Sequence, residues 1–89
     1  MYYMDNAATT VEKPRCVAEA VYEVLQSKEY GNPSRGTHDY ALNAMKKVEE
    51  ARTIASNLFH TSKTYEIAFT QNATTALNTV LKGVLEKGD

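Results

Sequence analysis

Cysteine is nearly absent from this 89-residue sequence, in which Cys16 is the single example. One thiol cannot form an internal disulfide, and it has no second cysteine with which to build a zinc knuckle. A disulfide-stapled scaffold is therefore excluded, and we expect the protein to work in a reducing compartment.

Long apolar runs and an excess of charge are also missing. No stretch approaches the roughly 18 apolar residues of a membrane span, and the opening Met1-Tyr2-Tyr3-Met4-Asp5 lacks the basic start and apolar core of a secretory signal. Ten basic against eleven acidic residues leave a net charge of -1, too little to attract nucleic acid or an anionic bilayer. We expect a cytoplasmic protein that binds neither nucleic acid nor membrane, so any anion site must be local.

What remains is an ordinary globular composition, with 43% hydrophobic and 24% charged residues. A chain of this length buries only about 60 to 65% of the surface that its unfolded form exposes, so its stability alone would be marginal. No repeat, low-complexity tract or linker-like composition divides it. We therefore treat residues 1–89 as one continuous segment.

Three stretches have the apolar period of an amphipathic helix. The first is predicted over 14–27, where Pro14 suits the first turn because its missing N–H would have no intrahelical partner there. The second and longest is predicted over 39–59, after a loop that two glycines and a proline predict over 30–36. The third follows residue 72, and we expect Gly88 to be its C-terminal cap. Its apolar stripe consists of Leu77, Val80, Leu81, Val84 and Leu85.

Residues 65–69, with the sequence Tyr-Glu-Ile-Ala-Phe, alternate large apolar with small or charged side chains, which predicts a half-buried strand. A second short extended piece is expected over 2–4. The order is helix, helix, strand, helix. Because a lone strand leaves backbone N–H and C=O groups without partners, the sequence predicts the opening of an α/β fold, and we expect its other strands downstream.

The turn from the predicted strand into the last helix, residues 70–75, has the chemistry of an anion site. The first N–H groups of a helix lack internal acceptors, and the aligned peptide dipoles place about half a positive charge there. Ala73 and Thr74 would direct such N–H groups at a phosphate, the hydroxyls of Thr74 and Thr75 would add donors, and Asn72 tolerates a left-handed backbone. The alternative is that Asn72 or Thr70 simply caps an ordinary helix. Neither a nucleoside-triphosphatase loop nor a dinucleotide fingerprint is present.

Three motifs together resemble the cysteine desulfurases, members of the class V aminotransferase group of fold-type I enzymes that depend on pyridoxal 5'-phosphate. They occur in the family's order and approximate spacing, and the resemblance runs over essentially the whole chain. It implies the N-terminal portion of a fold-type I transferase, about the first quarter of a family member, with the start of its large domain in residues 1–89. The motifs are Tyr3-Met4-Asp5-Asn6-Ala7-Ala8-Thr9-Thr10, Gly31-Asn32-Pro33-Ser34-Arg35-Gly36-Thr37-His38 and Phe69-Thr70-Gln71-Asn72-Ala73-Thr74-Thr75-Ala76-Leu77-Asn78.

The resemblance also implies site residues. Ala73 and Thr74 match the small residue and the threonine that hold the cofactor phosphate, although Asn72 stands where the family usually has glycine and Thr75 where it usually has glutamate. Asn6 and Ala7, in the segment near the substrate end of the active site, are the candidates for the substrate pocket.

The residues that would perform the chemistry have no match in the chain. Such an enzyme needs a lysine that bonds to the cofactor, an acid beside the ring nitrogen and a cysteine that takes the sulfur. None of the seven lysines fits a family motif, and nothing aligns Cys16 with the sulfur acceptor, so we expect a semi-buried small side chain there. For His38, a capping or packing role is favoured over acid–base catalysis. We therefore assign no catalytic residue and no metal ligand, and expect the chain alone to be inactive.

For a full-length enzyme that contains this segment, the resemblance implies a reaction that moves sulfur from L-cysteine into a protein persulfide. The reaction leaves alanine, and its sulfur is used in iron–sulfur cluster assembly. The resemblance also implies an amino-acid substrate, a sulfur-acceptor protein as a possible partner, and a homodimeric full-length enzyme. Other class V reactions remain open, namely transamination and the cleavage of selenocysteine or kynurenine. A different class of function is a stand-alone helical interaction module that binds a partner through the Val17/Val21/Val24 or the Leu77/Leu81/Leu85 stripe.

Overall fold

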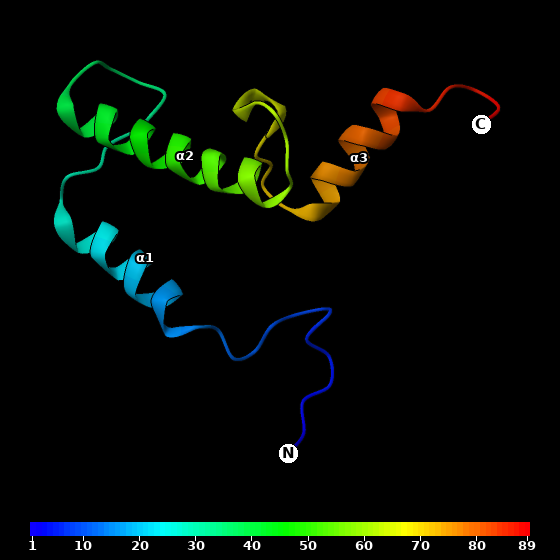
Figure 1. Ribbon diagram of the computed structural model, residues 1–89, viewed down its shortest axis with the longest axis horizontal. Helices are drawn as coiled ribbons and strands as arrows, with labels where there is room; N and C mark the ends of the chain where they lie inside the picture. Colours follow the sequence, from blue (N-terminus) through cyan, green and yellow to red (C-terminus); the bar gives the residue numbers. More distant parts are fainter. The chain divides into compact units, whose positions relative to one another are not determined.

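A computed structural model describes all residues, 1–89, and its regular elements are helical (Figure 1). The chain divides into two compact units, Met1–Val48 and Glu49–Asp89, with the boundary inside the second helix. None of the helices combines the length and the apolar character that crossing a bilayer requires. The elements are α1 (Arg15–Ser27), α2 (Asp39–Leu58), the 3-10 turn η1 (Thr64–Glu66) and α3 (Ala73–Val84).

The first predicted helix is confirmed as α1, with a difference at its start. Pro14 is the N-cap residue, with an extended backbone (φ -54°, ψ 139°), rather than a member of the first turn. Arg15 and Glu19 form an ion pair one turn apart, with Nε and Oε1 separated by 2.6 Å. Lys28 ends the helix in the left-handed conformation (φ 59°), a position where glycine is the usual residue.

The long helix α2 begins where His38 caps it, which confirms the capping role expected for this histidine. The His38 ring accepts a hydrogen bond at Nδ1 from the Ala41 N–H (3.3 Å), and its carbonyl accepts from the N–H groups of Ala41 (3.0 Å) and Leu42 (3.1 Å). Gly36 makes room for this ring: its φ is +94°, and a Cβ added there would lie 2.9 Å from His38 Cδ2. The cap therefore depends on a glycine two residues before it.

Two further bonds join the loop before α2 to the helix itself. The Gly31 N–H donates to the Tyr40 carbonyl (2.9 Å), and the Asn43 side-chain amide donates to the Glu29 carbonyl (3.1 Å). Beside them lie the buried apolar residues, Ala41 and Ala44. Because both are alanines, this packing removes little apolar area from water.

The predicted strand over 65–69 is not confirmed, and with it the α/β class. Thr64–Glu66 is a 3-10 turn, closed by hydrogen bonds from the Glu66 N–H to the Lys63 carbonyl (3.2 Å) and from the Ile67 N–H to the Thr64 carbonyl (3.1 Å). Ile67 is extended (φ -99°, ψ 116°) but pairs with no second strand. A ladder needs a partner strand, and none forms in this chain; residues 2–4 likewise have no regular structure.

The end of α3 also differs from the prediction. Its C-cap is Leu85, whose N–H donates to the Leu81 carbonyl (3.0 Å), and not Gly88. Gly88 has a positive φ of 107° but lies in a separate turn, which the Asp89 N–H closes on the Glu86 carbonyl (3.2 Å).

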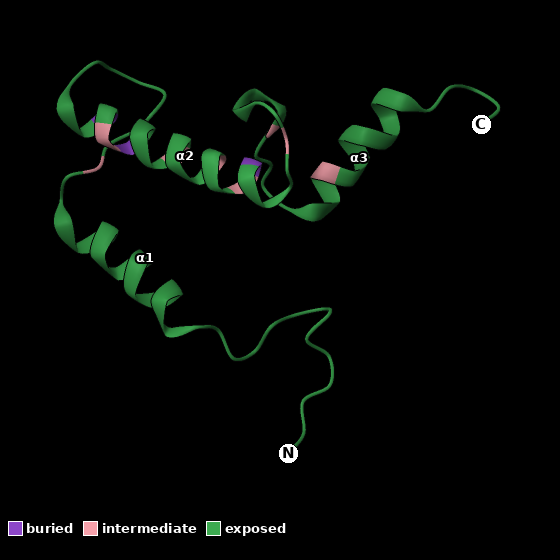
Figure 2. Cartoon of the chain, in the orientation of Figure 1, coloured by how far each residue is buried: buried purple, intermediate pink, exposed green.

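The apolar stripes of α1 and α3 lie exposed (Figure 2). Val21 keeps 55% of its surface accessible and Leu81 50%, and Cys16 is exposed rather than semi-buried as expected. The amphipathic pattern of the sequence therefore forms the helices, while the burial that usually accompanies such a pattern is missing.

Candidate functional site

The start of α3 is determined by Asn72. Its backbone is extended (φ -164°, ψ 171°), so the left-handed conformation considered for this residue is not used. Its side-chain Oδ1 accepts a hydrogen bond from the Thr75 N–H (2.8 Å), the usual N-cap arrangement. The simple capping role of Asn72 is therefore confirmed, and it occupies the third amide of the helix.

The first two amides of α3 remain unpaired. The backbone N–H groups of Ala73 and Thr74 donate to no group of the chain, and the hydroxyls of Thr74 and Thr75 make no hydrogen bond. No acidic residue lies in this first turn to offset the positive end of the helix dipole. Two free amides and two free hydroxyls at a helix start are a donor set that suits an anion.

Asn72 is itself held from both sides. The Thr70 hydroxyl donates to its carbonyl (3.0 Å), and the Ala76 N–H donates to the same oxygen (3.1 Å). Along the adjoining face of α3 runs a surface hollow of about 390 Å³. Its lining consists of Thr74, Thr75, Asn78, Thr79 and Lys82. The free hydroxyls thus border a shallow hollow that Thr, Asn and Lys side chains line, one of them cationic.

Arg52 of α2 contacts the segment that leads into this turn. Its Nη1 donates to the Ile67 carbonyl, its Nε pairs with Glu49 Oε1 (3.2 Å), and its guanidinium lies 5.1 Å from the centroid of the Phe69 ring. The side chain is only 23% exposed. The resemblance to the cysteine desulfurases includes Ala51-Arg52, but the sequence predicted no role for Arg52, because no local pattern indicates that a helix arginine meets a carbonyl 15 residues later.

The other candidate pair, Asn6 and Ala7, lies in a turn that Tyr3 closes. The Tyr3 hydroxyl donates to the carbonyls of Asp5 (3.0 Å) and Thr9 (2.7 Å). The Asp5 carbonyl also accepts from the N–H groups of Ala8 and Thr9, at 3.1 Å each. The turn therefore has a defined shape although it contains no helix or strand.

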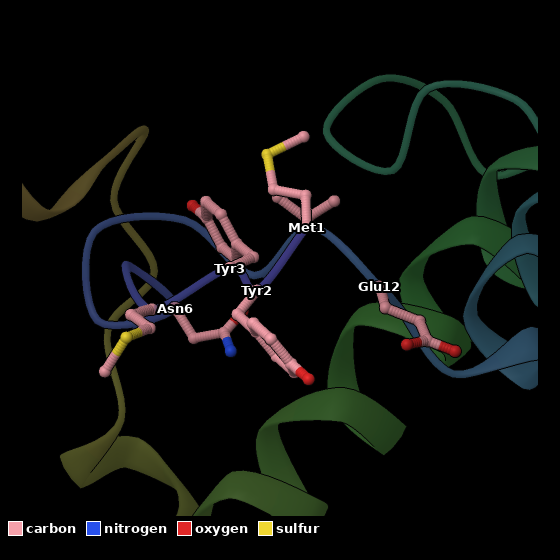
Figure 3. A pocket seen from close by; sticks show the side chains of 7 residues that line it. Met1, Tyr2, Tyr3, Asn6 and Glu12 are labelled. Carbon is pink, nitrogen blue, oxygen red and sulfur yellow. The ribbon is translucent and has the colours of Figure 1, made fainter.

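A hollow of about 550 Å³ adjoins this turn, and Asn6 and Glu12 both border it (Figure 3). The Asn6 side-chain amide makes no hydrogen bond within the chain, so its donors and its acceptor are available to a ligand. Ala7 is in the same turn but does not line the hollow. The remaining lining residues are Met1, Tyr2, Tyr3, Met4 and Val11.

The two candidate pairs lie in different units, Asn6 and Ala7 in Met1–Val48, and Ala73 and Thr74 in Glu49–Asp89. Each pair is thus defined within its own unit. No group of three or more His, Cys, Asp or Glu side chains comes together as a set of metal ligands.

Comparison with known proteins identifies the family. The profile described as "Aminotransferase class-V" matches residues 2–89. The chain belongs to the class V aminotransferase family. No solved structure is significantly similar to it.

Among curated proteins, this class V chain is similar to the cysteine desulfurase IscS of several bacteria. It is 42% identical to that of Rickettsia akari and 40% identical to that of Rickettsia massiliae, in each case over 82 residues. Those 82 residues are 92% of this chain and 19% of each relative. The desulfurase of Shewanella denitrificans is 33% identical over 82 residues, 20% of its length. The chain thus spans about a fifth of the length of these relatives.

Within the class V chain, the last of the three motifs that carry the resemblance leads into the start of α3. Its small residue and its threonine, Ala73 and Thr74, are the two residues whose amides are free. Asn72, which differs from the residue usual in the family, has a definite local role as the N-cap.

Proposed function

We propose that these 89 residues form part of a cysteine desulfurase that depends on pyridoxal 5'-phosphate, and that the start of α3 binds the cofactor phosphate. The free N–H groups of Ala73 and Thr74 carry this proposal. Class V membership and the similarity to cysteine desulfurases support it.

In this proposal the residues of α3 have separate tasks. The Ala73 and Thr74 amides and the Thr74 hydroxyl donate to phosphate oxygens, and the small Ala73 side chain lets the anion approach the backbone closely. The Thr75 N–H donates to Asn72 Oδ1 (2.8 Å), so only two backbone amides are available to bind the phosphate. An exposed helix start stabilises an anion by about 0.3 to 1 kcal/mol. Binding by this segment alone should therefore be weak, with a dissociation constant well above millimolar.

The N-terminal turn is proposed to border the substrate. The unpaired Asn6 amide is a suitable hydrogen-bonding group for an amino acid, and Ala7 leaves space beside it. Tyr3 holds this turn through its bonds to Asp5 (3.0 Å) and Thr9 (2.7 Å), so the Asn6 side chain starts from a defined backbone.

The proposed reaction moves sulfur from L-cysteine to a protein thiol, which yields a persulfide and alanine. When bound, the cofactor supplies an electron sink for negative charge on the substrate. A sulfur-acceptor protein and a homodimeric full-length enzyme complete the proposal. The 89 residues by themselves should not catalyse the reaction, because none of their seven lysines matches a cofactor lysine.

The phosphate site is tested by Ala73→Pro. Position 73 is the first helical residue and Asn72 before it is extended, so proline fits there without breaking the helix, and it removes the N–H. Inorganic phosphate or pyridoxal 5'-phosphate added to the labelled chain should shift the Ala73 and Thr74 amide resonances, and Ala73→Pro should weaken the Thr74 response several-fold. Ala73→Ser, which retains the amide, is the matched control. Equal phosphate affinity in Ala73→Pro and Ala73→Ser would contradict the site.

A separate experiment tests the catalytic part. The chain is mixed with pyridoxal 5'-phosphate, with and without L-cysteine, and the absorbance and sulfide are recorded. We expect no stoichiometric cofactor adduct beyond the nonspecific reaction of the aldehyde with surface amines, and no sulfide above a protein-free control; sulfide released in proportion to the chain would show that the 89 residues are catalytic.

A further inference from the structure

Arg52 is fixed at three points, all on its own unit of the chain. Its Nη1 donates to the Ile67 carbonyl, its Nε faces Glu49 Oε1 at 3.2 Å, and its Cζ atom lies over the Phe69 ring, 5.1 Å from the ring centroid. A planar guanidinium can bond in two directions and stack on a ring at the same time, whereas an ammonium cannot. Arg52 therefore defines the position of residues 67–69 relative to α2.

A continuous path of contacts joins that segment to α3. One residue after Phe69, the Thr70 hydroxyl donates to the Asn72 carbonyl (3.0 Å). The Asn72 side chain then accepts from the Thr75 N–H (2.8 Å), and the Asn72 carbonyl accepts from the Ala76 N–H (3.1 Å). The direction in which α3 starts is thus coupled to the place where Arg52 holds the chain.

This coupling matters because the segment has no other support from regular structure. Residues 67–70 belong to no helix or strand, and Phe69 keeps 53% of its surface exposed. In an exposed segment without regular structure, few contacts oppose local motion. A partner strand would hold such a segment through backbone hydrogen bonds. Here Arg52 supplies contacts to the segment instead.

We infer that Arg52 is a positioning residue for the anion site, holding residues 67–72 so that the Ala73 and Thr74 amides face a phosphate. This inference rests on the proposed function. Arg52 acts through the backbone and not by direct contact with the anion, because its guanidinium is already engaged with Ile67, Glu49 and Phe69.

The test compares the wild-type chain with three variants by amide NMR during titration with inorganic phosphate. Arg52→Gln removes the charge and the stacking, and Arg52→Lys keeps the charge but not the planar fork. Arg15→Gln is the matched control: it makes the same change of charge at an arginine whose side chain is 91% exposed. The ¹³Cα shifts of residues 77–84 show whether α3 itself remains helical.

We expect Arg52→Gln to weaken phosphate binding at Ala73 and Thr74 at least five-fold and to move the resonances of residues 67–72, with the helical shifts of 77–84 retained. Arg52→Lys should not restore the affinity, and Arg15→Gln should bind as the wild type does. Phe69→Leu, at an exposed position, is a milder variant that removes only the stacking and should weaken binding about two-fold.

The outcomes separate the two proposals. If the wild type binds phosphate and Arg52→Gln or Arg52→Lys binds it equally well, the positioning role is wrong while the phosphate site stands. If the wild-type Ala73 and Thr74 amides do not respond to phosphate, the proposed site is wrong, and the role of Arg52 toward it is wrong as well.

Discussion

At the scale of single residues, Asn72 connects the local fold to the proposed site. Its side chain occupies the Thr75 N–H and leaves those of Ala73 and Thr74 unpaired. A residue without a side-chain acceptor would leave three amides without partners, and the helix would fray from this end.

Asn72→Ala should therefore destabilise α3 by about 1 kcal/mol, because an N-cap hydrogen bond is lost. The measurement is the ¹³Cα shift and amide exchange of residues 73–77. Asn72→Ser should retain most of the helix, and Asn78→Ala should not reduce it, because Asn78 bonds to the Thr74 carbonyl (2.9 Å) within the helix and caps nothing. Unchanged exchange in Asn72→Ala would contradict the capping role.

Tyr3 holds the N-terminal turn through its hydroxyl group. Tyr3→Phe removes the donor to the Asp5 and Thr9 carbonyls, so the amides of Ala8 and Thr9 should exchange several-fold faster. Tyr2→Phe is the matched control, since the Tyr2 hydroxyl makes no hydrogen bond within the chain. Equal exchange in the two variants would show that Tyr3 does not hold the turn.

At the scale of elements, Gly36 and Gly83 have different roles. Gly36 is needed for its backbone conformation, whereas Gly83 only lowers the helix propensity of α3. Gly83 lies in α3 with nothing within 4 Å of an added Cβ, whereas Gly36 has a φ of +94° and the His38 ring beside it. One is a helix residue that happens to lack a side chain, and the other permits the cap of α2.

Gly83→Ala should stabilise α3 by about 0.5 to 1 kcal/mol, because alanine has the higher helix propensity. Gly36→Ala should instead loosen the first turn of α2, since its Cβ would lie 2.9 Å from the His38 ring. Helical ¹³Cα shifts and amide exchange of each helix report both effects. A loss of α3 structure in Gly83→Ala, or an unchanged α2 start in Gly36→Ala, would contradict the assignment.

At the scale of the whole molecule, the chain has helices but almost no core. Its buried residues are Ala41, Ala44 and Ser56, while the large apolar side chains of α1 and α3 are exposed. Stability in globular proteins comes mainly from burial of such side chains, since short helices are marginal by themselves in water.

Leu81→Ala should accordingly change the free energy of unfolding by less than about 1 kcal/mol, compared with about 2 to 5 kcal/mol for a buried leucine. Ala41→Leu should be the more damaging substitution, because Ala41 is 1% exposed and a larger side chain overpacks the site. Thermal unfolding followed by circular dichroism should be broad in the wild type. A sharp transition that Leu81→Ala lowers strongly would show that α3 is buried in solution.

The exposed stripes also bear on the interaction-module hypothesis. The Val17/Val21 and Leu77/Leu81 surfaces are accessible to another polypeptide, whether that is a separate protein or further chain of a class V enzyme. The sedimentation profile of the 89-residue chain tests the first case: a defined, cooperative oligomer would favour a stand-alone module, and heterogeneous association would favour a segment of a larger fold.

Much of the local structure could be read from the sequence. The apolar period predicted all three helices to within a few residues, a capping or packing role was expected for His38, and three motifs together led to the family that the comparison confirms. These features depend on neighbours within about one helical turn, and such information is contained in a short window of sequence.

What the sequence alone determined is therefore the set of helices and the class V membership. Only the tertiary structure decided that residues 65–69 form no strand, that the stripes of α1 and α3 remain exposed, and that Arg52 holds the Ile67 carbonyl. The reason is physical: a strand, a buried face and a long-range hydrogen bond each need a partner that is distant in the sequence. A periodic pattern indicates which face of an element is apolar, but it does not show whether another part of the chain covers that face.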